Sequence, residues 1–169
     1  DVGRAISVLT IHNLKFQGIY DRKMIQYWSG LPDYVFNKDC MIQNWLDANM
    51  LKGGIAYSNK VTTVSNTYAW EIQTEEYGEG LAEHLRYHQN KILGIVNGID
   101  TDIWNPATDK LLAADYDEKS AIKNKKINKK ALQESLGLDV DEHKMVIGLI
   151  SRLTNQKGLD LVNDVIPGI

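Results

Sequence analysis

Residues 60–70, KVTTVSNTYAW, join a short apolar run directly to a signal that starts a helix. The run Lys60–Val64 is rich in β-branched residues, which is typical of a strand buried in a sheet. Ser65 is a favourable N-cap residue, and Tyr68 and Ile72 follow it at helical spacing. The stretch therefore predicts a strand that passes into a helix, the repeating unit of α/β proteins.

Three further apolar runs predict strands, and each is followed by polar or glycine-containing residues: Ala5–Ile11, Lys91–Val96 and Lys144–Ile150. Continuous apolar runs suit strands that are covered on both faces, as in parallel sheets. Helical patterns lie between and after these runs, over Met41–Tyr57, from Asn128 to Leu136 with a stop at Gly137, and from Gly158 onward. The order of strands and helices predicts an α/β fold with a parallel sheet.

The composition of the chain excludes several classes of protein. Its 169 residues are 43% hydrophobic and 24% charged, which is typical of a globular chain, and no apolar run is long enough to span a membrane. The net charge of −3 argues against nucleic-acid binding, which favours basic surfaces. Cys40 is the single cysteine, so no intrachain disulfide can form, and no base lies beside it to support a catalytic thiol.

Residues 101–117, TDIWNPATDKLLAADYD, contain a proline, several aspartates and no clear period, which indicates a crossover or hinge. One predicted strand and one short helix at the end of the chain cannot bury a core by themselves, so we expect the central part of a larger protein. The basic stretch Lys123–Lys130 is interpreted as the solvated face of a helix that packs through Leu132 and Leu136, rather than as an anion-binding patch.

Ligands of open parallel sheets bind at the carboxyl ends of the strands, so the residues that follow each strand are the candidates for a site. Polar side chains follow three of the predicted strands: His12, Asn13 and Gln17, then Asn97, then Arg152 and Lys157. His12 is compatible with two roles, a structural residue at a strand end and a member of a polyol site with Asn13. The residues alone do not decide between them.

The stretch SRLTNQKGLDL, residues 151–161, places Arg152 and Lys157 where a strand turns into a helix. Backbone N–H groups and the helix dipole favour an anion at such a place. Arginine can hold a phosphate with two hydrogen bonds, and lysine acts as a movable point charge. The spacing matches neither a P-loop nor a dinucleotide-binding fingerprint. A solvated surface loop with two unrelated basic residues is the alternative.

Other clusters of reactive side chains give no site. His84 and His88 lie at i and i+4, but HLRYH lacks the glutamate of the zinc-protease motif and offers no third ligand. The acidic residues Glu75, Glu76 and Glu79 are interpreted as a solvated loop. We therefore predict no metal site and no cofactor.

Four stretches, in this order, carry a resemblance to a known family: TIHNLKFQGIY, VTTVSNTYAWEIQTEEYGEGL, GIVNGIDTDIWNPATD and SRLTNQKGLDL. Together they closely resemble the bacterial glycogen synthases and plant starch synthases. The resemblance implies a GT-B fold, in which two Rossmann-like domains face each other across a cleft. It also implies an enzyme that transfers glucose from ADP-glucose to the non-reducing end of an α-1,4-glucan. Such transfer retains the anomeric configuration and requires no metal.

The resemblance also implies how the chain is divided. Residues 1–96 would be the later part of the N-terminal, acceptor-side domain, and residues 97–117 the interdomain connection. Residues 118–169 would open the C-terminal domain, which binds the nucleotide sugar. The implied partners are ADP-glucose, an α-1,4-glucan and the rest of the same polypeptide, without which we expect the chain to be inactive. A bacterial cytoplasmic location is favoured over a plastid.

Site residues are implied by the same resemblance, and they are His12, Arg152 and Lys157 as catalytic residues and Asn13, Gln17 and Asn97 as substrate-binding residues. Arg152 and Lys157 would hold the donor diphosphate and neutralise the charge that grows on it. His12 would lie by the transferred glucosyl unit, and Asn97 would hydrogen-bond the donor glucose.

Two residues depart from the family pattern: Asn66 replaces a usual proline and Asn59 a usual aspartate. Asparagine at the first helical position is expected to cost about 1 kcal/mol or less. One alternative function is another GT-B transferase, such as a sucrose-type synthase, although IHNLKFQG together with NPATD argues against it. A glucan-binding descendant without turnover is the other alternative.

Overall fold

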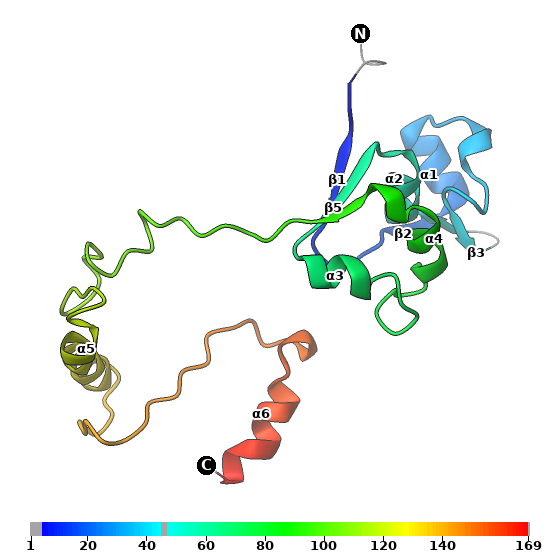
Figure 1. Cartoon of the computed structure of the whole chain (residues 1–169). Coiled ribbons are helices and arrows are strands. Elements are labelled where there is room, and N and C mark those ends of the chain that lie inside the picture. The colour runs from blue at the N-terminus through cyan, green and yellow to red at the C-terminus, as the bar shows by residue number, and fades with distance from the viewer. Residues whose placement is uncertain (1–4, 45–46, 169) are drawn as a thin grey trace. The chain divides into compact units, whose positions relative to one another are not determined.

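The computed structural model describes residues 5–44 and 47–168 (Figure 1). The chain divides into two compact units, Asp1–Gly98 and Ile99–Ile169. The division of the chain into residues 1–96, 97–117 and 118–169 stays a prediction.

The first unit contains a parallel sheet of β1 (Val8–Ile11), β5 (Lys60–Thr63) and β6 (Ile92–Gly94), in the order β1-β5-β6. Three of the four predicted strands are thus confirmed, each shorter than its apolar run. The last residue of β5, Thr63, pairs with Ile11 on one side and Gly94 on the other, so the three strands end level. This level edge is where a ligand of a parallel sheet is expected to bind.

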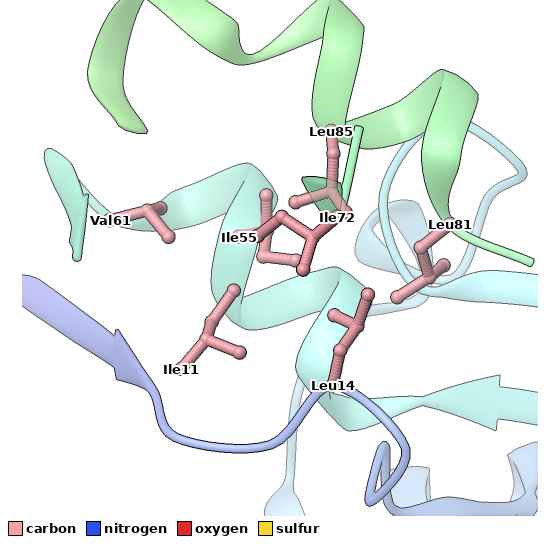
Figure 2. Packing of buried hydrophobic residues seen from close by; sticks show 7 residues of the cluster. All are labelled: Ile11, Leu14, Ile55, Val61, Ile72, Leu81 and Leu85. Atoms are coloured by element: carbon pink, nitrogen blue, oxygen red, sulfur yellow. The ribbon is translucent and has the colours of Figure 1, made fainter. Parts of the chain in front are cut away.

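Seven buried side chains form the core of the first unit: Ile11, Leu14, Ile55, Val61, Ile72, Leu81 and Leu85 (Figure 2). They come from the sheet, from α2 (Met50–Tyr57) and α4 (Ala82–Tyr87), and from the loops, where Ile72 directly follows α3 (Asn66–Glu71). Three consecutive residues of the central strand, 61–63, are buried, whereas Val8 on the edge strand is 60% exposed. The prediction that the strands are covered on both faces is therefore correct for the central strand β5 and wrong for the edge strands.

A second, antiparallel sheet has the order β2-β4-β3, from β2 (Ile19–Asp21), β4 (Asp47–Asn49) and β3 (Ile42–Asn44). The predicted helix over Met41–Tyr57 is therefore wrong in its first half. The Asn49 side chain accepts a hydrogen bond from Lys52 N at 2.9 Å and starts α2 at Met50, while Asn49 N donates to Met41 O at 2.7 Å. This cap signal was hidden within a run of apolar residues that fits a helical period as well as a strand.

Three further helical elements of the first unit were not predicted from the sequence. Helix α1 (Arg22–Ser29) begins at Asp21, whose side chain accepts from Met24 N, and ends at Gly30, which has a φ of 65°. A short 3-10 helix, Asp33–Val35, follows, and a second one, Gln89–Lys91, precedes β6. A small core of Val35, Phe36, Met41 and Ala48 packs beside the antiparallel sheet.

The second unit contains α5 (Ala121–Ser135), the 3-10 helix Asn155–Lys157, α6 (Leu159–Val165) and the 3-10 helix Ile166–Gly168. The predicted helices near Asn128 and Gly158 are confirmed, although α5 begins earlier. Its predicted packing through Leu132 and Leu136 is wrong, because these side chains are 47% and 63% exposed. The buried residue of α5 is Gln133, whose amide bonds to the backbone of Asp141.

Lys144–Ile150 does not form the predicted strand, and Ile150 is fully exposed. A strand exists only by hydrogen bonding to a neighbour, and no strand is assigned among the described residues of this unit, 99–168. The segment 101–117 forms turns and bends without a helix or strand, as its sequence indicated. In the part of the chain that the structure describes, no helix is long and apolar enough to cross a membrane.

Candidate functional site

His12 and Asn13 follow β1 directly and are both exposed, whereas the residues on either side, Ile11 and Leu14, are 2% and 1% exposed. The backbone N–H of Leu14 donates to the Tyr68 hydroxyl on α3 at 3.1 Å. The two polar side chains are therefore held outward between two buried anchors. This arrangement favours a surface that contacts a ligand over a histidine that serves the core.

A tight turn fixes the backbone immediately after His12. Asn13 Oδ1 accepts a hydrogen bond from Lys15 N at 3.0 Å, and Asn13 O accepts one from Phe16 N at 3.4 Å. The turn leaves the amide nitrogen of Asn13 available to a ligand, since the oxygen already has a partner. No hydrogen bond of the His12 ring is recorded among the described residues.

The end of β1 is held by a residue that the sequence reading missed. The buried hydroxyl of Thr63 on β5 donates to Ile11 O at 2.9 Å, at the peptide unit that precedes His12. A second pair of hydroxyls, Thr10 and Thr62, lies 2.9 Å apart across the same two strands. These bonds fix the position of His12 at the carboxyl edge of the sheet. The run of threonines in KVTTVS is the signal that could have revealed them.

Asn97 lies three residues beyond β6 and is exposed. Ile95 N donates to Thr63 O at 2.7 Å, which continues the ladder past the end of β6. A Cβ atom at Gly94 would lie 2.4 Å from Ser65 O, so only glycine lets this strand pass the start of α3 so closely. His12 and Asn97 leave the same edge two strands apart, roughly 10 Å at ordinary strand spacing.

Gln17 is 8% exposed, and its side chain is directed into the protein. Its Nε2 donates to Glu79 O at 2.8 Å, and its Oε1 accepts from Asn49 Nδ2 at 2.6 Å. Gln17 thus lies in the same loop as His12 and Asn13, but both polar atoms of its amide already bond to other protein groups. Its predicted contact with substrate stays a prediction.

Arg152 and Lys157 belong to the second unit and are both exposed. Arg152 O accepts from Thr154 N at 2.9 Å, and Lys157 N donates to Thr154 O at 3.0 Å, so two successive turns lie between them. Gly158, with a φ of 64°, then starts α6. The predicted loop and helix are present, but the strand predicted to precede them does not form, and both cations are free of a salt bridge among the described residues.

The histidine pair is a packed cluster and gives no metal site. The rings of His84 and His88 lie 4.7 Å apart, and His84 Nε2 is 3.1 Å from Lys52 O. Burial, with a smaller contribution from His88, lowers the pKa of His84 from 6.5 to about 4. Burial, and then the charge of Lys91, also lowers the pKa of His88. Within residues 5–44 and 47–168, no three potential metal ligands gather.

The acidic loop is only partly the solvated segment that was expected. Glu75 forms an ion pair with Arg86 at 2.8 Å, and Arg86 also donates to Gln73 O at 2.7 Å. Glu79 has a φ of 47°, and its carbonyl accepts from Gln17. This loop is therefore tied to α4 at one point and to the segment after β1 at another.

Comparison with known proteins identifies the family. The family model described as the starch synthase catalytic domain matches residues 2–87, which is 86 of 169 residues. The chain belongs to the starch synthase catalytic domain family. A glycogen synthase of Lachnospira eligens is 54% identical over 92% of this chain and 32% of that protein, and one of Thermotoga maritima is 51% identical over 96% of this chain and 33% of that protein.

A solved structure, the catalytic domain of starch synthase IV from Arabidopsis thaliana bound to ADP and acarbose, matches with a TM-score of 0.87. It is 40% identical and covers 95% of this chain and 33% of that chain. The predicted fold class, GT-B with Rossmann-like domains, is confirmed by this match. The chain spans about a third of the length of its starch and glycogen synthase relatives.

The two departures from the starch synthase pattern have simple local explanations. Asn59 Oδ1 accepts hydrogen bonds from Ser7 N at 2.9 Å and from Ser7 Oγ at 3.0 Å. An aspartate offers the same acceptor oxygen, so this position serves to join the starts of β1 and β5. Asn66 is the first residue of α3, and Ser65 Oγ accepts from Tyr68 N at 2.9 Å. The serine cap thus starts the helix without a proline.

Proposed function

We propose that the chain is the central part of a retaining glucosyltransferase that adds glucose from ADP-glucose to the non-reducing end of an α-1,4-glucan. The observation that carries the proposal is the presentation of His12, Asn13 and Asn97, all exposed, from the level carboxyl edge of the sheet. The identity to glycogen and starch synthases supports it, as does the relative bound to ADP and acarbose. The bacterial relatives support a bacterial cytoplasmic location.

In this proposal the two units supply different parts of the reaction. Residues 1–96 carry the later part of the acceptor-side domain, residues 97–117 connect the domains, and residues 118–169 begin the nucleotide-sugar domain. Arg152 and Lys157 bind the diphosphate of ADP-glucose. The negative charge on this leaving group grows as the glycosidic bond breaks, so fixed cations bind it more strongly in the transition state than in the ground state.

His12, Asn13 and Asn97 provide the sugar-binding side. Their side chains offer hydrogen-bond donors and acceptors for hydroxyl groups of the transferred glucose. Because the turn after His12 is fixed at both ends, the backbone of His12 is positioned before substrate arrives, which reduces the entropy lost in reaching the reactive geometry. Neither a metal nor another cofactor is part of the proposal.

Two substitutions in the full-length protein test the assignment of the cations. We expect Arg152→Ala and Lys157→Ala each to lower kcat by on the order of 100-fold, as for loss of one donor to a developing anion, with a smaller effect on glucan affinity. Lys119→Ala, an exposed lysine of the same unit, is the matched control. Transfer from radiolabelled ADP-glucose to glycogen is the measurement. Normal kcat in both variants would remove the two residues from the active site.

His12→Ala distinguishes a catalytic residue from a structural one. We expect an unchanged melting temperature and a fall in kcat of several orders of magnitude, since about 1.4 kcal/mol corresponds to each tenfold loss. A large drop in melting temperature with normal activity of the folded fraction would make His12 structural. A full-length protein that binds glucan but does not transfer glucose would favour the non-catalytic alternative. Transfer of glucose to fructose would favour the sucrose-type alternative.

A further inference from the structure

Three amide side chains form a largely buried chain of hydrogen bonds at the end of the loop that carries His12. Asn49 Nδ2 donates to Gln17 Oε1 at 2.6 Å and also to Gln43 Oε1. Gln17 Nε2 donates onward to Glu79 O at 2.8 Å. Asn49 is fully buried and Gln17 is 8% exposed, so water competes little for these bonds.

Backbone groups at both ends fix the orientation of every amide in this network. Glu79 O can only accept, so Gln17 must present Nε2 to it and Oε1 to Asn49. Lys52 N can only donate, so Asn49 must present Oδ1 to it and Nδ2 to Gln17, and the Lys52 N to Asn49 Oδ1 distance is 2.9 Å. A single pattern of donors and acceptors therefore satisfies the network, and a flipped amide would break it.

The network joins four segments that are distant in sequence. Gln17 ends the loop after β1, Asn49 caps α2, and Gln43 lies in β3. Glu79 lies in the loop before α4, in the left-handed backbone region with a φ of 47°. Backbone bonds reinforce the junction, because Gln17 O accepts from Leu51 N at 3.0 Å.

The loop that carries His12 and Asn13 is thus held at three points. Ile11 O is bound by Thr63 at its start, and Leu14 N is bound by Tyr68 in its middle. Gln17 is the third point, and it is the one that connects the loop to the acidic segment and to α2. Without it, the stretch after Leu14 keeps the local bond from Lys15 N to Asn13 Oδ1 and the backbone bonds of Gln17 and Gly18 to the start of α2.

We propose that Gln17 is a positioning residue for glucosyl transfer, which acts by holding the His12–Asn13 loop through Asn49 and Glu79 and does not touch the sugar. The inference rests on the proposed function. It replaces direct substrate binding, since both polar atoms of the Gln17 amide already have protein partners. Displacement of a reacting geometry by about 1 Å can cost about 100-fold in rate, so a displaced loop would lower kcat although no contact to substrate is removed.

Gln17→Glu in the full-length protein is the first test. The variant has the same shape, but an ionised carboxylate cannot donate to Glu79 O. A protonated carboxyl can donate to Glu79 O and accept from Asn49, so acid should restore the network. Burial raises the pKa of such a carboxyl, which brings this recovery into an accessible range.

We expect kcat of the folded variant, relative to wild type at the same pH, to be about 10- to 100-fold lower at pH 8. At pH 5.5 we expect the deficit to shrink to about threefold. KM for ADP-glucose should change less than kcat. Asn49→Ser is the second variant, which keeps an oxygen to cap Lys52 N but removes the donor to Gln17. It should lower kcat similarly at both pH values, and it decides the matter if Gln17→Glu does not fold.

Gln73→Glu is the matched control, because Gln73 Nε2 also donates to a backbone carbonyl, that of Ala69, at 2.7 Å but outside the network. It should leave kcat unchanged. Wild-type kcat in folded Gln17→Glu at pH 8, or a deficit that does not shrink with acid, would overturn the positioning role while the proposed function stands. A full-length wild-type protein without glucosyl transfer would overturn the proposed function and this inference together.

Discussion

Acidification is expected to destabilise the first unit through His84, where α4 packs on α2. Its Nε2 lies 3.1 Å from Lys52 O, and the neighbouring titratable groups are His88, Lys52 and Lys91. Lys91 itself donates to two carbonyls at the end of α2, those of Ala56 and Ser58, at 2.9 Å each. A proton on His84 would therefore add a positive charge close to the ammonium groups of Lys52 and Lys91.

The sign and size of the effect follow from the two pKa values. Burial, and next His88, lowers the pKa of His84 in the folded protein from 6.5 to about 4. Between these values the unfolded chain binds the additional proton, so the free energy of unfolding falls as the pH decreases from 6.5 toward 4. For a fully buried ring this difference would be about 3 kcal/mol. His84 is partly exposed, and solvent screening reduces the expectation to about 1–2 kcal/mol.

The measurement is urea unfolding followed by tryptophan fluorescence between pH 8 and pH 4, for wild type and His84→Gln. Glutamine does not titrate and can still donate to Lys52 O, so the variant should lose about 1–2 kcal/mol less stability over this range. His143→Gln is the control, because the side chain of His143 is 86% exposed. Equal pH dependence in wild type and His84→Gln would refute the reasoning.

Three further substitutions, one of them with a control, test the two ends of the parallel strands by thermal unfolding. Thr63→Val keeps the shape but leaves Ile11 O without its hydroxyl donor, and we expect a loss of about 1–2 kcal/mol. Gly94→Ala places a Cβ 2.4 Å from Ser65 O and should lower the free energy of unfolding by about 2–3 kcal/mol. Gly98→Ala is the control, because no atom lies within 4 Å of its Cβ, and it should change the stability little. Equal melting temperatures of the two variants would contradict the close packing at Gly94. Asn59→Asp keeps its acceptor oxygen and should change the free energy of unfolding by less than about 0.5 kcal/mol.

The sequence predicted those elements that are determined by neighbouring residues. Local sequence pattern determines the strand that begins at Lys60 and the helix α3 with its N-cap Ser65, and the structure confirms both. Lys144–Ile150 has an equally good strand pattern, but a strand requires a partner that the described residues of the second unit do not offer. The Met41–Tyr57 stretch was misread because its apolar residues fit two periods, and only the cap at Asn49 decides where the helix begins.

The candidate site was predictable to a similar extent. Polar residues after strand ends gave His12, Asn13 and Asn97, and the structure presents all three at one edge. That Gln17 faces inward could not be predicted, because its partners, Asn49 and Glu79, lie 32 and 62 residues away. Side-chain partners at such distances are set by the tertiary fold and leave no local pattern in the sequence.

The pairing of β1 with β5 has a consequence for synthesis on the ribosome. Each residue of β1 pairs with one 52 positions later in β5, as in the pair Ile11 and Thr63. At about 5–20 residues per second, β1 waits roughly 3–10 s before its partner is made. The antiparallel sheet of β2, β4 and β3 lies wholly within that interval and is built from near neighbours. This sheet can fold first and shorten the loop that must close, and until β5 is made the backbone groups of β1 lack their β5 partners.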